Sequence, residues 1–228
     1  MQAIILAGGK ATRLRPYTDD RPKAMVEVGG APIVAHQIRW LVGNGVKEAV
    51  VSCGYRAEIL QEYLRDGSEL GISLTYAVES EPLGRGGGLK FAARHLPHPE
   101  DFTFALNGDI LCRFSLGDLL EHHRSVGATA TLALAPYKTT WGITDVEDGR
   151  ITGFRQSPTL PYWINGGIYV LEPECIELLP DKGDHEDSTF PQLAREGRLG
   201  GYQINGYWRG IDNAKDVLEA SPDLENLG

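Results

Sequence analysis

The 228-residue sequence predicts an α/β fold built on a mixed, mostly parallel sheet. Two observations support this prediction. Short apolar runs rich in β-branched residues recur along the first half of the chain, and such runs are typical of strands buried on both faces. Each run leads through a loop into a stretch with helical spacing, and this alternation indicates parallel strands joined by right-handed crossovers.

The elements of the first half follow this alternation in order. The predicted strands cover 4–7, 49–53, 72–78 and 102–106. The predicted helices run from Pro32 to about Gly43, over 56–65, and from Leu89 to His95 after a loop rich in glycine.

The second half contains shorter strands and more turns. Helices are predicted over 115–125, 186–196 and 213–220, with another opened by Pro173. The predicted strands cover 128–135, 142–146, 151–154, 165–171 and 201–204. Because no linker-like or low-complexity tract separates the halves, we expect residues 1–228 to form one domain.

Composition excludes several classes of protein. The formal net charge of −9 disfavours a surface for nucleic acid or an anionic membrane. No stretch reaches the ~20 apolar residues that span a bilayer, and residues 1–7 lack the features of a signal peptide. Three widely spaced cysteines without a C-x-x-C pair indicate buried thiols in a reducing compartment. We therefore expect a cytoplasmic protein with no nucleic-acid partner and no membrane contact.

A basic loop follows the first strand. The chain passes through Gly8 and Gly9 into a segment with five cations, Lys10, Arg13, Arg15, Arg21 and Lys23. Glycines at a strand end let backbone N–H groups approach a ligand, and consecutive N–H groups surrounded by cations suit phosphate. Neither the P-loop spacing G-x-x-x-x-G-K-[ST] nor the dinucleotide spacing G-x-G-x-x-G opening a helix is present, so this is a different phosphate loop.

Residues 6–23 resemble the signature of the sugar-1-phosphate nucleotidyltransferases, L-A-G-G-x-G-T-R-L-x-P-x-T…P-K, with Ala11 replacing the third glycine. The resemblance implies a Rossmann-like three-layer domain with a nucleotide-binding half at about 1–112 and a sugar-phosphate-binding half at about 113–228. It also implies that Arg13 and Lys23 are catalytic. The implied nucleotide-binding residues of the loop are Leu6, Ala7, Gly8, Gly9, Lys10 and Thr12.

Asp109 follows a buried strand and a glycine, so we expect its carboxylate at the carboxyl edge of the sheet, beside the phosphate loop. It would repel phosphates there unless a divalent cation intervened, and Mg²⁺ typically binds carboxylates together with phosphate oxygens. The family's Gly-Asp metal ligand matches Asp109. The family's second aspartate usually falls where this chain has Gly210, but a branch that includes cytidylyltransferases carries it at the position of Asp212. Asp212 is thus the implied second Mg²⁺ ligand; alternatively, it only caps the last helix.

Residues 79–84 resemble the family's E-x-x-P-L-G element, which borders the nucleotide base. This adds Glu79, Pro82 and Gly84, together with Asn107, to the implied nucleotide-binding residues. A carboxylate accepts hydrogen bonds from N–H groups of guanine, uracil or thymine but matches N3 of cytosine poorly. Glu79 therefore disfavours cytosine, whereas the placement of Asp212 resembles a branch of the family that includes cytidylyltransferases. The sequence thus leaves the identity of the nucleotide base undecided.

The implied sugar-phosphate-binding residues are Gly142, Gln156, Asn165 and Gly167. The family's E-K-P element would fall at Gln156-Ser157-Pro158. Gln can replace Glu as a partner of sugar hydroxyls, but Ser cannot replace the Lys charge on a phosphate. Either another cation, Arg155 or Lys138, supplies that charge, or turnover is weak.

The resemblance implies an enzyme that transfers a nucleoside monophosphate from an NTP to a sugar 1-phosphate, with Mg²⁺ as cofactor and pyrophosphate as second product. Among sugars and bases, a mannose-1-phosphate guanylyltransferase-like activity is favoured. The alternative is a non-catalytic, nucleotide-sugar-binding or regulatory subunit of the same fold, which the departures at Ala11 and Ser157 keep open. The expected partners are the NTP and the sugar 1-phosphate, and a homodimer is a further option.

Overall fold

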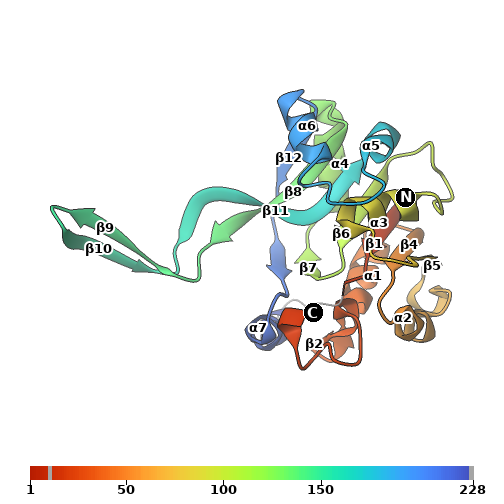
Figure 1. Ribbon diagram of the computed structural model, residues 1–228, viewed down its shortest axis with the longest axis horizontal. Coiled ribbons are helices and arrows are strands. Elements are labelled where there is room, and N and C mark those ends of the chain that lie inside the picture. The colour runs from red at the N-terminus through yellow and green to blue at the C-terminus, as the bar shows by residue number, and fades with distance from the viewer. Residues whose placement is uncertain (10–11, 226–228) are drawn as a thin grey trace.

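A computed structural model describes residues 1–9 and 12–225 of the chain. Its centre is a seven-stranded sheet in the order β12-β8-β11-β6-β1-β4-β5 (Figure 1). The strands are β1 (Gln2–Leu6), β4 (Glu48–Cys53), β5 (Ser73–Val78), β6 (Thr103–Asn107), β8 (Ala130–Lys138), β11 (Thr159–Leu171) and β12 (Leu199–Gln203). Within this sheet β11 runs antiparallel to both of its neighbours, whereas the other neighbouring pairs are parallel. The predicted mixed, mostly parallel sheet is confirmed.

Helices cover both faces of the sheet, which gives three layers. They are α1 (Ile33–Gly43), α2 (Ala57–Leu64), α3 (Gly84–Ala93), α4 (Leu116–Val126), α5 (Pro173–Leu178), α6 (Thr189–Arg195) and α7 (Ala214–Glu225). Side chains of α1, α2 and α4 share one hydrophobic core with Ile5, and side chains of α3, α5 and α6 share a second core with Ile4. Because successive residues of a strand point to opposite faces, Ile4 and Ile5 supply one side chain to each layer.

A third, smaller hydrophobic core packs against α7. It contains Leu14 of the helical turn η1 (Thr12–Leu14), Val28 of β2 (Glu27–Val28), Leu111 of β7 (Ile110–Arg113), Ile211, and Val217 of α7. β2 pairs with β3 (Ala31–Pro32), and β7 pairs with β13 (Tyr207–Gly210). The remaining short turns are η2 (Lys23–Met25) and η3 (Ser68–Leu70). The sequence analysis did not predict the ribbon of β7 and β13, which holds the C-terminal segment against the strand that follows β6.

The third helix begins earlier than the sequence predicts. The structure starts α3 at Gly84, so the glycines expected in a loop lie in its first turns. A Cβ at Gly86 would come 2.8 Å from the backbone N of His185, and a Cβ at Gly87 would come 2.7 Å from the carbonyl oxygen of Asp181. Gly86 and Gly87 therefore leave room for the backbone of residues 181–185.

A two-stranded hairpin extends from the body as a long arm (Figure 1). It consists of β9 (Gly142–Glu147) and β10 (Arg150–Gln156), joined by Asp148 and Gly149, which both have positive φ. Two consecutive positive φ angles suit the tight turn of a hairpin, and Asp-Gly is a preferred pair for it. Both strands were predicted, but their projection from the body was not. Among the described residues, no helix combines the length and apolar character that a membrane span requires.

Candidate active site

A cavity of about 680 Å³ opens at the carboxyl ends of the central parallel strands. The predicted nucleotide-binding residues that line it are Leu6, Ala7, Gly8, Gly9, Glu79, Pro82, Gly84 and Asn107. Lys23 and Asp109 line the same cavity. Ligands of open α/β sheets bind at this edge, because loops after neighbouring parallel strands converge there. The structure therefore brings together residues predicted from four separate segments of the chain.

The other predicted residues have different locations. Lys10 lies outside the described residues, and so does the side chain of Arg13. Thr12 begins η1 and is exposed. Gly142 and Gln156 face each other across the first pair of the arm, and neither is among the residues lining the cavity. Their predicted roles stay predictions.

Asp109 and Asp212 are brought together by the ribbon of β7 and β13. Gly210 pairs with Ile110, and the N–H of Ile211 donates a 2.9 Å hydrogen bond to the carbonyl oxygen of Asp109. This register leaves the two aspartates at the same end of the ribbon, although 102 residues separate them (212 minus 109, less one). The ammonium group of Lys23 contacts both carboxylates, with Nζ 2.8 Å from Oδ2 of Asp109 and 3.0 Å from Oδ1 of Asp212. The two oxygens are thus separated by at most the sum of these distances.

The side chain of Asn213, rather than that of Asp212, caps α7. Oδ1 of Asn213 accepts hydrogen bonds from the backbone N–H groups of Lys215 and Asp216, at 2.9 and 3.2 Å. The carboxylate of Asp216 accepts in return from the N–H groups of Asp212 and Asn213, at 2.8 and 3.0 Å. This reciprocal arrangement is a capping box, with Asp at the position that Glu often takes. The side chain of Asp212 is therefore left free of the capping role.

The acidic pair fits a divalent cation. Asp109 and Asp212 supply hard oxygen donors, and both already converge on one positively charged group. The side chain of Asp109 is 31% exposed and that of Asp212 is 67% exposed, so the acidic pair lies at the mouth of the cavity, where a phosphate and water can complete a coordination shell.

Glu79 lines the same cavity, and two hydrogen bonds hold its carboxylate. Its Oε1 accepts a 3.0 Å hydrogen bond from the hydroxyl of Ser52, and its Oε2 accepts a 3.1 Å bond from the N–H of Leu83. A Cβ at Gly88 would come 2.8 Å from Oε1, so the glycine leaves room for this carboxylate. Each carboxylate oxygen can accept a second hydrogen bond, so Glu79 keeps acceptor capacity for a ligand.

Asn107 has an unused acceptor at the end of β6. Its backbone carbonyl accepts a 2.8 Å hydrogen bond from Gln37, but its buried side-chain oxygen Oδ1 has no partner among the described residues. A buried amide oxygen without a partner costs about 1–3 kcal/mol. Because Asn107 lines the cavity, a ligand hydroxyl or N–H group could recover that cost.

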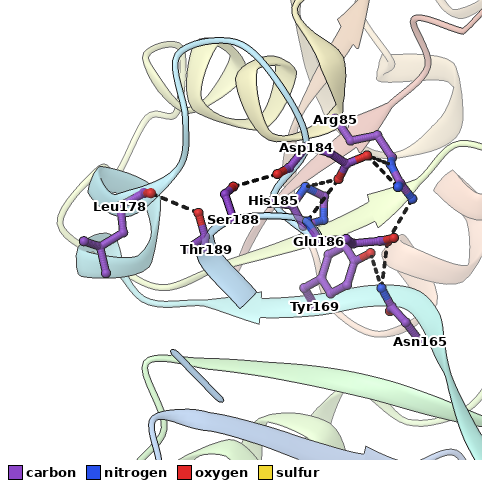
Figure 2. Close-up of polar contacts among 9 residues, drawn as sticks. All are labelled: Arg85, Asn165, Tyr169, Leu178, Asp184, His185, Glu186, Ser188 and Thr189. Carbon is purple, nitrogen blue, oxygen red and sulfur yellow. Dashed lines mark hydrogen bonds and ion pairs between the residues drawn. The ribbon is translucent and has the colours of Figure 1, made fainter. Parts of the chain in front are cut away.

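Sequence reasoning missed a polar network beside the cavity (Figure 2). Arg85 lines the cavity and donates to Asp184 at 2.7 Å and to Glu186 at 2.8 Å. The same oxygen of Glu186 accepts a 2.9 Å hydrogen bond from Nδ2 of Asn165, whose Oδ1 accepts from the N–H of Gly167. The predicted sugar-binding residues Asn165 and Gly167 are therefore joined to Arg85. The only sign of this network in the sequence is Arg85 itself, a charged residue directly before three glycines.

Burial and charge set the protonation of this network. Burial alone would raise the pKa of Asp184, but the N–H of Glu186 and the guanidinium group of Arg85 outweigh it, and the pKa is lowered. The neighbouring imidazole of His185 is fully buried, and burial lowers its pKa to about 4. Near neutral pH, Asp184 is therefore charged and His185 is neutral.

The structure is thus an α/β protein with a cavity of about 680 Å³ at the carboxyl edge of its sheet and two aspartates beside it. The sequence matches the family described as Nucleotidyl transferase over residues 2–226. The chain belongs to this family, whose members generally depend on a divalent metal.

Relatives agree with this assignment, and a solved structure shares the fold. The mannose-1-phosphate guanyltransferase of Yarrowia lipolytica is 35% identical over 229 residues, which cover 97% of this chain and 63% of that protein. The enzyme of the same name from Pichia angusta is 38% identical over 232 residues, covering 96% and 62%. This chain thus spans less than two thirds of the length of these curated relatives. The crystal structure of HddC from Yersinia pseudotuberculosis, complexed with GMP-PN, shares the fold with a TM-score of 0.78 at 24% identity, covering 98% of this chain and 99% of that one.

Proposed function

We propose that this chain transfers a nucleoside monophosphate from an NTP to a sugar 1-phosphate and releases pyrophosphate, with GTP and mannose 1-phosphate as the favoured substrates. The observation that carries the proposal is the convergence of Asp109 and Asp212 on Lys23, at the mouth of a cavity lined by the phosphate loop. The names of the guanyltransferase relatives support the choice of base and sugar.

Asp109 and Asp212 would hold Mg²⁺. When bound, this ion would neutralise charge on the α-phosphate of the nucleotide and polarise it. Lys23 lies between the same carboxylates, and its charge would hold the α-phosphate and the sugar phosphate in register. Arg13 would neutralise charge on the departing pyrophosphate. No general base is required, because the attacking phosphate oxygen is already ionised.

The remaining cavity residues would bind the nucleotide. Backbone N–H groups near Gly8 and Gly9, with Lys10 and Thr12, would hold the phosphates. Glu79 would accept hydrogen bonds from N1–H and the exocyclic amino group of guanine, which cytosine cannot donate in that pattern. The unpartnered Oδ1 of Asn107 would accept from the ribose or the base.

Asn165, Gly167, Gly142 and Gln156 would contact the sugar 1-phosphate, and Arg85 would supply the positive charge that Ser157 lacks. Of the two cations first considered for that role, Arg155 is bonded to Asp145 on the arm, at 2.6 and 3.0 Å. Arg85 instead lines the cavity and is joined through Glu186 to Asn165. Its carboxylate partners fix the position of the guanidinium group, which can still present free N–H donors to a phosphate.

We also propose that the chain acts as one domain, since strands from both halves form one sheet, and that it works in the cytoplasm as a homodimer. The free thiols of Cys53, Cys112 and Cys175 support a reducing compartment.

The test is a product assay with each of the four common NTPs and mannose 1-phosphate, in Mg²⁺ and in EDTA. We expect a nucleotide-sugar and pyrophosphate in equal amounts, fastest with GTP and absent in EDTA. Matched thermal melting with each NTP reports binding independently, because a ligand that binds the folded state raises the melting temperature. Stabilisation by GTP without product from any sugar 1-phosphate would favour the non-catalytic alternative.

A further inference from the structure

Lys23 occupies the space between the two carboxylates of the candidate cation site. Its Nζ lies 2.8 Å from Oδ2 of Asp109 and 3.0 Å from Oδ1 of Asp212, and its side chain is only 16% exposed. Pro22 restricts the backbone before it, and the two residues after it are buried in the first hydrophobic core. A movement of the ammonium group therefore involves the side chain of Lys23 alone.

This ammonium group competes with a divalent cation. Among the residues that the structure describes, Lys23 is the only one that forms an ion pair with Asp109 or Asp212. Its single charge leaves one of the two negative charges unbalanced, whereas a divalent cation would balance both. Mg²⁺ takes oxygen ligands at about 2.1 Å, closer than Nζ lies to either oxygen. An ion bound to these oxygens would repel the ammonium group at short range, so the two cannot share the site.

We infer that Lys23 keeps the cation site closed in the absence of a nucleotide and that a bound nucleotide opens it, a role that rests on the proposed function. Lys23 lines the same cavity as Gly8 and Gly9 of the phosphate loop. Phosphates bound there offer the ammonium group new anionic partners, and its departure leaves both carboxylates to the ion. Nucleotide and cation then favour each other's binding, since such coupling is reciprocal. The chain thereby takes up a cation together with a nucleotide in preference to a free cation.

The aspartates can receive the ion without a change of fold. The side chain of Asp212 is 67% exposed, and its carboxylate takes no part in the cap of α7, so it can turn toward an incoming ion. The backbone stays fixed, because the N–H of Ile211 bonds the carbonyl oxygen of Asp109 and the N–H of Asp212 bonds the carboxylate of Asp216. The switch consists of one lysine side chain and two carboxylates.

The first test uses Mn²⁺ alone, an oxygen-seeking ion that electron paramagnetic resonance detects, and it needs no substrate. Lys23→Met removes the competing charge and should tighten Mn²⁺ binding by about tenfold or more. The matched control is Lys215→Met, which removes the same charge close to Asp212 in the chain and should bind Mn²⁺ like the parent, because Lys215 pairs with Glu219 instead. Adding Asp212→Asn to Lys23→Met should abolish the gain.

Two controls make this result specific. The exposed side chains of His98, Glu100 and Asp101 have ligand atoms within 4.8 Å of one another, and any Mn²⁺ that they bind would be the same in all variants. Circular dichroism checks that Lys23→Met is folded. Its melting temperature should rise more with Mn²⁺ than that of the parent, because a ligand that binds the folded state stabilises it.

The second test observes the lysine directly. Crystals of the parent chain with Mn²⁺ alone should show no anomalous signal between Asp109 and Asp212, whereas crystals with Mn²⁺ and GTP should show one, with Nζ of Lys23 on phosphate oxygens. Equal Mn²⁺ affinity in the parent and Lys23→Met, an equal gain in Lys215→Met, or an ion bound while Lys23 still contacts both carboxylates would overturn the inference and leave the proposed function standing. An ion absent from both crystals would overturn the inference together with the proposed cation site.

Discussion

Replacing Asp212 with Asn tests the role of the displaced aspartate. Asn has the shape of Asp without the charge that a hard dication prefers. Because Asn213 and Asp216 form the capping box, the start of α7 should be preserved. The lost ion pair with Lys23 involves a side chain that is 67% exposed, so it should cost at most about 1 kcal/mol of folding free energy.

The effect on turnover should be far larger. Losing one of two carboxylates at the cation should lower kcat by about a hundredfold or more, equivalent to about 2.7 kcal/mol of transition-state stabilisation. The assay is initial-rate pyrophosphate release over a series of Mg²⁺ concentrations, where the half-saturating concentration should rise. Asn213→Ala is the matched control: it should cost about 1 kcal/mol of stability through the lost cap and leave the Mg²⁺ requirement unchanged.

Parent-like turnover and Mg²⁺ dependence in Asp212→Asn would refute this reasoning. An equal loss in Asn213→Ala would also refute it, because the common cause would then be the packing of α7.

Four further predictions concern other parts of the site. Arg13→Ala should lower kcat more than it raises KM for the nucleotide, and the reverse pattern in initial rates would limit Arg13 to ground-state binding. Glu79→Gln should reduce the ratio of kcat/KM for GTP over CTP by about tenfold, with Glu81→Gln as control; an unchanged ratio would remove Glu79 from base recognition. Arg85→Lys should raise KM for the sugar 1-phosphate but not for GTP, because Lys cannot keep two carboxylate partners and a phosphate; equal rises would contradict this role. Burial lowers the pKa of His185 to about 4, so as the pH falls the imidazole is protonated in the unfolded chain before it is protonated in the folded chain. The neutral, buried His185 therefore contributes about 3 kcal/mol at most to the free energy of unfolding above pH 6.5, and this contribution is lost as the pH falls toward 4. Urea unfolding across this range should show a flatter slope for His185→Phe, and identical slopes would contradict the assignment.

Local signals were enough to predict the central strands and the phosphate edge. The apolar run before Gly8 and the strand before Asp109 are contiguous patterns, and the parallel topology alone places both strand ends at one edge. The glycines of α3 were assigned to a loop, although they lie in a helix. The contact that requires glycine there is with the chain segment 181–185, almost one hundred residues away, and no local pattern shows it.

Long-range pairing also explains what the sequence could not provide at the site. Arg85 meets Glu186 across an interval of 101 residues, and no local pattern encodes such an ion pair. The ribbon of β7 and β13 consists of four-residue strands, too short for a clear alternation, yet it positions Asp212. The resemblance supplied Asp212 as a candidate, and only the folded register explains why it faces Asp109.

The most direct test of the central claim is the effect of Mg²⁺ on GTP affinity, measured by titration calorimetry in the parent chain and in the double variant Asp109→Asn with Asp212→Asn. If the two carboxylates share a cation with the phosphates, Mg²⁺ should tighten GTP binding to the parent by about tenfold or more, since without it the carboxylates repel the nucleotide. In the double variant, GTP should bind more tightly than to the parent in EDTA, and Mg²⁺ should add little. An equal Mg²⁺ effect in both proteins would contradict the account.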